Sequence, residues 1–290
     1  MRLTGWVVGL LAALLWSEVL ATEAVECRHD SLRISLIPVK NMGRLTEDYR
    51  PLADLLSTGL RMPVRILHAS SYQGVMDAVI SGGTDVARLG PASYLQAWKS
   101  NPAIEPFASL APEPGYFSTG GSYYSSLLLA RGDGARRSIE DLRGQLVALN
   151  DPASTSGALI PRHEFAALVG EPLVNYFSGL IYAGSHDRAL DALLKGRVEA
   201  AFVSSERADE YLAQGLITEN SLRVLWRSEP IHYDPLVFSG VVCEELKQRI
   251  RQLMTTPSPE LSEFLRNQRA ERVVPVTHDT YHSLLRRIGE

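Results

Sequence analysis

Residues 150–157 read NDPASTSG, and the stretch ALIPRHEFAALVG follows at 158–170 with apolar residues at helical spacing. Ser154, Thr155 and Ser156 are therefore three hydroxyl residues in a row at the expected start of a helix. Serine and threonine are preferred N-cap residues, so by itself the octapeptide favours an ordinary helix cap. A helix N-terminus also leaves backbone N–H groups without intrahelical partners and carries partial positive charge. The same cluster therefore suits an oxyanion such as phosphate, phosphonate or sulfate.

Strand and helix patterns alternate on both sides of this stretch, which is typical of α/β layers built on a largely parallel sheet. The predicted strands are 32–39, 63–69, 84–90, 122–131, 145–151, 180–184, 198–204, 222–229 and 235–242. The predicted helices are 45–60, 73–82, 92–99, 158–170, 186–195, 245–254, 258–267 and 278–288. Ser138 and Asp141 have capping-box spacing at the start of another helical turn. We therefore expect an α/β fold.

The order of these elements predicts two α/β lobes, the second inserted into the first. We expect lobe 1 to comprise residues 22–130 and 235–290, and lobe 2 to comprise residues 131–234. Two segments, near 127–133 and 231–238, are expected to cross between the lobes. Crossing segments of this kind form hinges, and ligands of such proteins bind in the cleft between the lobes.

The first 21 residues have the pattern of a secretory signal peptide: a basic residue, an apolar run over 6–16 and small residues before an expected cleavage after Ala21. An uncleaved membrane anchor is the alternative, although the run is short for a span. A lipid anchor on Cys27 is disfavoured because Glu26 stands where such signals need a small residue. No other segment approaches the ~18 apolar residues of a membrane span. We therefore expect export to the periplasm.

The chain has 290 residues, of which 45% are hydrophobic, and a formal net charge of −4. This is ordinary globular composition, and the acidic balance argues against a nucleic-acid-binding surface. The histidines show no metal-binding spacing such as H-E-x-x-H, so we expect no metal and no cofactor. Cys27 and Cys243 can form one disulfide in an oxidising compartment, but the sequence leaves open whether they meet.

Beginning at NDPASTSGALIP, the chain resembles the PhnD-like phosphate/phosphite/phosphonate-binding periplasmic proteins of ABC transporters. Further stretches fit that family in the same order: HASSYQGVMDAVISGGTDVARLGPASYLQA (68–97), GSYYSSLLLAR (121–131), SIEDLRG (138–144), AGSHDRALDALLKGRVEAAFVSSE (183–206) and IHYDPLVF (231–238). The resemblance spans roughly residues 32–270. It implies a type II periplasmic binding protein whose partner is an ABC permease in the inner membrane. We expect it to work as a monomer.

The resemblance also implies how the anionic end of a ligand is held. Ser154, Thr155 and Ser156 match the hydroxyl cluster that holds the phosphonate oxygens. His186 matches a histidine that hydrogen-bonds the anionic group, and a protonated imidazole there is expected to strengthen the hold as the pH falls. Tyr72 matches a ligand-contacting tyrosine of the first lobe. Simple packing or capping is the alternative for Tyr72 and His186.

A second tyrosine is expected on the crossing strand. Tyr123 and Tyr124 are adjacent, and alternation along a strand directs only one of them toward the cleft. The resemblance selects Tyr123. Tyr94, in GPASYLQA, is a weaker candidate for the lining of the cleft.

The orientation of two acids distinguishes between the ligands that the resemblance implies. Glu206 and Asp234 match acids that face the ammonium group in members binding aminoalkylphosphonates. Two carboxylates repel a bare anion, but they complement a ligand that also carries an amine. If both point into the cleft, a zwitterion such as 2-aminoethylphosphonate is favoured. If they point outward, phosphite, phosphate or methylphosphonate is favoured instead.

The expected function is that of a solute-binding protein that closes over a phosphonate-type ligand and delivers it to a permease. One alternative is a ligand-sensing module with a membrane signalling partner. A hydrolase is disfavoured: Ser156, His186 and Asp234 occur in the order of a triad, but neither a G-x-S-x-G nor an S-x-x-K motif accompanies the serines.

Overall fold

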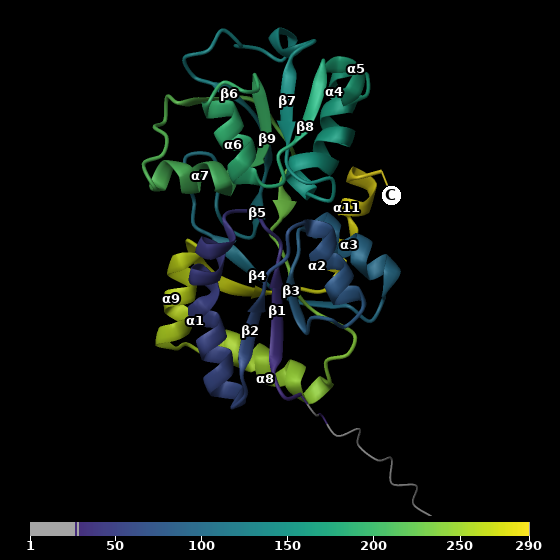
Figure 1. Cartoon of the computed structure of the whole chain (residues 1–290), viewed down its shortest axis with the longest axis vertical. Helices are drawn as coiled ribbons and strands as arrows, with labels where there is room; N and C mark the ends of the chain where they lie inside the picture. The colour runs from purple at the N-terminus through teal and green to yellow at the C-terminus, as the bar shows by residue number, and fades with distance from the viewer. Residues whose placement is uncertain (1–26, 28, 290) are drawn as a thin grey trace, which may run out of the picture.

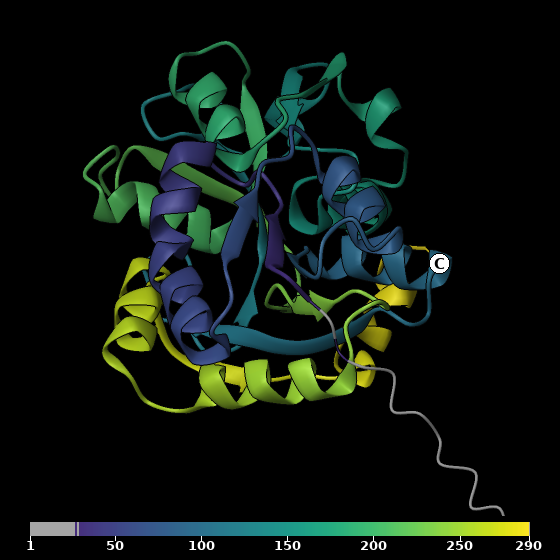
Figure 2. The same ribbon diagram turned by 60° about the horizontal axis from the view of Figure 1, so that its bottom comes forward.

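A computed structural model describes residues 27 and 29–289 and has two lobes (Figure 1). Lobe 1 is built on a six-stranded sheet in the order β13-β4-β12-β3-β1-β2. Its strands are β1 (Leu32–Leu36), β2 (Val64–Leu67), β3 (Val86–Arg88), β4 (Glu105–Pro112), β12 (Leu236–Phe238) and β13 (Ala270–Pro275). Its helices are α1 (Met42–Leu60), α2 (Tyr72–Ile80), α3 (Pro91–Ser100), α8 (Glu244–Thr255), α9 (Pro259–Asn267), α10 (His278–His282) and α11 (Leu284–Arg287). Figure 2 shows α1, α8 and α9 around the outside of this sheet.

Lobe 2 is built on a five-stranded sheet in the order β10-β6-β9-β7-β8. Its strands are β6 (Ser126–Arg131), β7 (Leu146–Leu149), β8 (Gly179–Tyr182), β9 (Ala200–Ser204) and β10 (Leu222–Arg227). Its helices are the 3₁₀-helix η1 (Glu140–Leu142), the π-helices η2 (Thr155–Leu159) and η3 (Pro161–Phe165), α4 (Ala166–Val169), α5 (Leu173–Tyr176), α6 (His186–Leu194) and α7 (Ser205–Ala213). Ser138 and Asp141 form the expected reciprocal backbone caps.

The two sheets are mixed, so the prediction of largely parallel sheets is wrong. β1 pairs in parallel with β2 and β3, and β7 pairs in parallel with β8 and β9. In contrast, β12 runs antiparallel to β3 and β4, and β6 runs antiparallel to β9 and β10. The reason is topological: β6 and β12 each follow a crossing from the other lobe. They therefore start at the lobe interface, where the parallel strands end.

The second lobe is inserted into the first, as predicted, but the boundary differs. The crossing segments meet in a two-stranded antiparallel ribbon of β5 (Tyr123–Tyr124) and β11 (Ile231–His232). β6 already belongs to the lobe 2 sheet, so the first crossing precedes residue 126 and does not fall at 127–133. Strands β4 and β13 were not predicted. β4 carries Pro106 and Pro112, and proline in a strand argues against that assignment.

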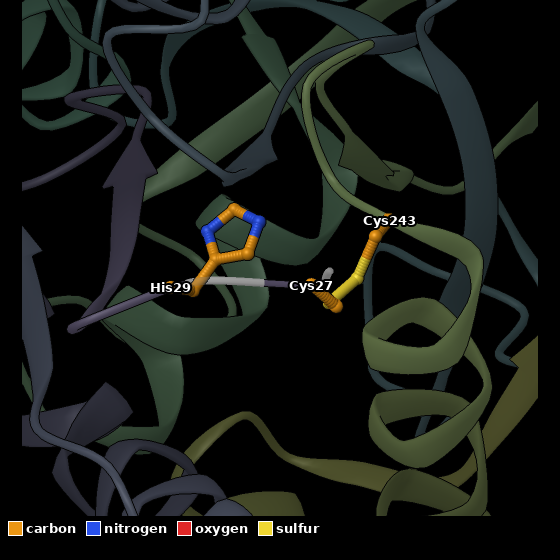
Figure 3. A group of neighbouring side chains, drawn as sticks. All are labelled: Cys27, His29 and Cys243. Carbon is orange, nitrogen blue, oxygen red and sulfur yellow. A yellow bond between two sulfur atoms is a disulfide. The ribbon is translucent and has the colours of Figure 1, made fainter. Parts of the chain in front are cut away.

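Cys27 and Cys243 are bonded, which answers the question that the sequence left open (Figure 3). The bond joins the segment before β1 to the N-cap residue of α8. With His29 these cysteines form the one group of metal-ligand spacing among the described residues, but both sulfurs are engaged in the disulfide. The proposed signal peptide, residues 1–21, lies outside the described residues. Within residues 29–289, none of the helices is long and apolar enough to cross a bilayer.

Candidate functional site

A pocket lies between the lobes, at the ends of the parallel strands. The enclosed space there is small, and side chains of both lobes line it. Its lining residues are Ile37, Val39, Tyr72, Gly90, Tyr124, Ser154, Thr155, Ser156, His186, Glu206 and Asp234. Seven of the eight residues predicted from the sequence are therefore brought together in one place.

Five helix N-termini converge on this pocket. Tyr72 and His186 are the first residues of α2 and α6, and Glu206 is the second residue of α7. Gly90 and Ser154 are the N-cap residues of α3 and η2. A helix N-terminus leaves backbone N–H groups without intrahelical partners and carries partial positive charge. The fold thus concentrates positive potential here, although none of the described lining residues is Lys or Arg.

The hydroxyl cluster serves both as a cap and as pocket lining. Ser154 Oγ accepts a hydrogen bond from the Gly157 N–H at 3.1 Å, which makes Ser154 the N-cap. Thr155 Oγ1 accepts from the Ala92 N–H of α3 in lobe 1 at 2.9 Å. Ser154, Thr155 and Ser156 are at most 2% exposed. Because the cap uses acceptor lone pairs, the hydroxyl hydrogens of the cluster stay available as donors.

The helix opens with a wide π-type turn. The Leu159 N–H donates to the Ser154 carbonyl at 3.0 Å, five residues back. The N–H groups of Thr155 and Ser156 therefore precede the first intrahelical bond of the helix. A wide first turn at the hydroxyl cluster is the kind of local irregularity that is common at functional sites.

The structure reverses the choice between the two neighbouring tyrosines. Tyr124 is 5% exposed and lines the pocket, whereas Tyr123 is 50% exposed and packs its ring against His232. The prediction of Tyr123 is corrected to Tyr124, because the short ribbon directs alternate residues to opposite faces. Tyr94 also lies outside the pocket, where it is buried and hydrogen-bonded to His278 Nδ1 at 2.8 Å.

His186 is a neutral hydrogen-bonding group, which corrects the expectation of a protonated imidazole. It is 4% exposed, and burial lowers its pKa to about 3. The Ser204 N–H donates to His186 Nδ1 at 3.1 Å. Since a backbone N–H can only donate, Nδ1 must accept, and the proton of the neutral ring lies on Nε2.

Both predicted acids line the pocket, but only Asp234 has an ion-pair partner among the described residues. Asp234 forms an ion pair with Arg88 at 3.0 Å, and both side chains are more than nine-tenths buried. Burial raises the pKa of Asp234, and the Arg88 guanidinium opposes that shift. Glu206 Oε2 is buried without a hydrogen-bond partner among the described residues. Burial raises the pKa of Glu206 to about 7.

Arg88 and Tyr124 were missed in the sequence. Arg88 interrupts the apolar strand β3, where its neighbours Val86, Ala87 and Leu89 are all buried. A lone charge in a strand predicted to be buried is unusual, because buried charges need a partner. That signal was present in the sequence, but the identity of the partner was not.

The geometry rules out the triad order considered from the sequence. The hydrogen bonds of His186, among the described residues, join it to Asn150 and to the Ser204 backbone. Asp234 pairs with Arg88 and not with the imidazole. Without a carboxylate to orient it, His186 is not placed as the base of a Ser-His-Asp arrangement.

The lobes touch directly around the pocket. The Tyr72 N–H of lobe 1 donates to Asp151 Oδ2 of lobe 2 at 3.3 Å, and Ser93 Oγ donates to the Ala153 carbonyl at 2.8 Å. The segment that carries the hydroxyl cluster thus docks on the N-termini of α2 and α3. These contacts hold the two lobes together beside the pocket, as in the closed arrangement of a two-lobed binding protein.

Comparison with known sequences points to one family. The model of a family described as "ABC transporter, phosphonate, periplasmic substrate-binding protein" matches residues 34–281. The phosphate-import protein PhnD of Mycolicibacterium smegmatis is 28% identical over 273 residues, which cover 87% of this chain and 83% of the relative. The phosphonates-binding periplasmic protein of Escherichia coli is 25% identical over 239 residues, which cover 81% of this chain and 68% of the relative.

Comparison with solved structures supports the same two-lobed fold. A binding-protein component of an ABC phosphonate transporter from Pseudomonas aeruginosa superposes with a TM-score of 0.81 at 21% identity, covering 90% of this chain and 86% of that one. PhnD1 from Prochlorococcus marinus, solved in complex with methylphosphonate, gives a TM-score of 0.75 at 17% identity, covering 90% and 97%.

Proposed function

We propose a ligand for this chain, which belongs to the family of periplasmic substrate-binding proteins of phosphonate ABC transporters. The proposed ligand is an aminoalkylphosphonate, with 2-aminoethylphosphonate as the best candidate. The observation that carries this proposal is the buried Oε2 of Glu206, which has no hydrogen-bond partner among the described residues, in a pocket whose other carboxylate, Asp234, is already paired with Arg88. Members of this family bind their substrates without reacting with them, so the protein is not an enzyme.

The phosphonate end is assigned to the converging helix N-termini. The N–H groups that open η2 and the hydroxyls of Ser154, Thr155 and Ser156 supply donors for three oxygens. His186, a neutral ring with its proton on Nε2, lines the same pocket and also contacts the Asn150 amide. These groups hold a multi-oxygen anion by dipoles and hydrogen bonds, without a formal positive charge.

The phenols of Tyr72 and Tyr124 complete this end of the proposed site. Burial raises the pKa of both phenols, so each remains protonated and can donate a hydrogen bond to the anion. Both tyrosines line the same pocket as the hydroxyl cluster.

The ammonium end is assigned to Glu206. A buried oxygen without a partner carries a desolvation cost of about 1–3 kcal/mol, and more when it is charged. A ligand ammonium removes that cost by forming a charge-assisted hydrogen bond. Methylphosphonate, phosphite and phosphate cannot, so a carboxylate at this position disfavours them.

The proposed role in the cell is delivery of the ligand to a membrane transporter. We propose that the chain is exported by its N-terminal signal peptide, works as a monomer and is read in its closed form by an inner-membrane permease. The pocket is lined by residues of both lobes, so a bound ligand would stabilise the closed form relative to the open one. This supports the proposal that the permease recognises the closed form.

Calorimetric titration of the mature protein with 2-aminoethylphosphonate, methylphosphonate, phosphite, phosphate and sulfate tests the ligand. We expect the aminoalkyl ligand to bind most tightly, and we expect Glu206→Gln to weaken that ligand about 10- to 100-fold, the loss of one charge-assisted hydrogen bond. The same variant should leave methylphosphonate binding unchanged or improved. Equal affinity of the wild type for methylphosphonate and 2-aminoethylphosphonate would overturn the assignment.

A further inference from the structure

Asp234 has its own counterion within lobe 1. Arg88 Nη2 lies 3.0 Å from Asp234 Oδ2, and the same nitrogen donates to the Tyr233 hydroxyl at 3.3 Å. The pair is built into the sheet, because Arg88 ends β3 and is in register with Leu236 of the antiparallel strand β12. Asp234 stands two residues before Leu236, so its partner does not depend on how the lobes are placed.

Glu206 belongs to the other lobe and has no ion-pair partner within residues 29–289. It lies near the start of α7, and its Oε2 has no hydrogen-bond partner among the described residues. Two cations that line a neighbouring pocket together with Glu206 are paired with other acids: Lys40 with Glu210 at 3.0 Å, and Arg207 with Asp187 at 2.5 Å. The charge of Arg88 lowers the pKa of Glu206, but the ion pair of Arg88 is with Asp234.

The two acids are therefore not equivalent, although the sequence suggested a matched pair. Two buried carboxylates without counterions would require two positive charges from the ligand. Because Arg88 is present, the pair Arg88–Asp234 has no net charge. The ligand then needs to supply only one positive charge, to pair with Glu206. Arg88 also places a positive charge beside the position of any ligand cation that approaches Asp234.

We propose that Arg88 sets the ligand specificity of this pocket by neutralising Asp234, so that Glu206 alone pairs with a single cationic group of the ligand. This inference rests on the proposed function and assigns a specificity-determining role to a residue outside the pocket lining. It identifies the ligand class as one anionic phosphonate group with one amine, and it excludes ligands with two amines.

A charge-compensation cycle tests the inference, using the ratio of the methylphosphonate Kd to the 2-aminoethylphosphonate Kd at one pH. Arg88→Met frees the carboxylate of Asp234, so we expect the ratio to rise about tenfold or more, a change of about 1.4 kcal/mol. Asp234→Asn leaves Arg88 uncompensated, so we expect the ratio to fall by a similar factor. The double variant Arg88→Met/Asp234→Asn should return to within about threefold of the wild type.

The ratio of the two Kd values distinguishes a specificity role of Arg88 from a purely structural one. If Arg88→Met weakens both ligands in parallel and the ratio stays constant, Arg88 is only a structural ion-pair partner and the inference is wrong. If Arg88→Met does not fold, the isosteric Asp234→Asn still decides, because an unchanged or increased ratio contradicts the inference. A wild-type protein that binds neither phosphonate overturns the proposed function itself.

Discussion

The two ends of the pocket hold charge by different means. The end made by Ser154, Thr155 and Ser156 offers helix N-termini and hydroxyl groups. The end made by Glu206 and Asp234 carries acidic groups, and Asp234 is paired with Arg88 outside the lining. Dipoles aligned by a helix need no counterion and are fixed by local backbone geometry. Buried formal charges must be balanced over longer distances. Under the proposed function, the first end holds any phosphonate and the second chooses among them.

The largest expected effect comes from removing the hydroxyl donors. Ser154→Ala/Thr155→Ala should weaken every phosphonate and phosphate about 100-fold or more, because two charge-assisted hydrogen bonds of about 1.5–3 kcal/mol each are lost. Calorimetric titration with methylphosphonate and 2-aminoethylphosphonate measures this, and both ligands should lose affinity equally.

Ser258→Ala provides a matched control for this double variant. Ser258 Oγ caps α9 by accepting from the Leu261 N–H at 3.0 Å, and Ser258 is not a lining residue of the pocket. Its loss should cost about 1 kcal/mol of stability, like that of Ser154, and leave ligand affinity unchanged. If Ser154→Ala/Thr155→Ala also left affinity unchanged, the cluster would be a cap and nothing more.

A smaller effect on stability and ligand affinity is expected from a substitution at Gly157, which follows the hydroxyl cluster. A Cβ atom on Gly157 would lie 1.9 Å from Asn150 Nδ2, so Gly157→Ala must displace Asn150, which contacts His186. We expect a stability loss of about 1–3 kcal/mol from overpacking, together with weaker binding of all phosphonates. Thermal unfolding and titration measure the two effects. The substitution Gly83→Ala is the control for an added methyl group, because its Cβ would meet its nearest neighbours at 3.4 Å and Gly83, like Gly157, does not have a positive φ.

The smallest expected effect is a pH dependence of the affinity for 2-aminoethylphosphonate, which arises from Glu206. Burial raises the pKa of Glu206 to about 7, so in the free protein this carboxyl is protonated below that pH. A ligand ammonium pairs with the ionised form, so binding releases a proton near pH 7, and affinity for 2-aminoethylphosphonate should rise about tenfold between pH 6 and pH 8. Calorimetry in buffers of different ionisation enthalpy measures the released proton.

Glu206→Gln is the control for this pH dependence. Titration of the phosphonate group itself affects both proteins, so the ratio of wild-type to variant affinity isolates Glu206. If that ratio is flat from pH 6 to pH 8, the carboxyl does not pair with the ligand amine.

Local signals explain why much of the anion-holding end was predictable. Ser154 caps the helix in the way that its position after a strand indicates, and Tyr72 and His186 stand at helix starts that the sequence also marks. The choice between Tyr123 and Tyr124 was not predictable, because alternation states that one faces inward but not which one. That choice depends on how the short ribbon of β5 and β11 is placed between the lobes.

By itself, the sequence determined the alternation of α and β elements and the hydroxyl-capped helix start, because each depends on neighbours within a few residues. The order of these elements along the chain also indicated that one lobe is inserted into the other. Only the tertiary structure decided that Arg88 pairs with Asp234, that Cys27 is bonded to Cys243 and that His186 is neutral. The first two join residues far apart in the chain, and the third results from burial. Pairing and burial depend on the packing of the whole fold, and no local pattern encodes them.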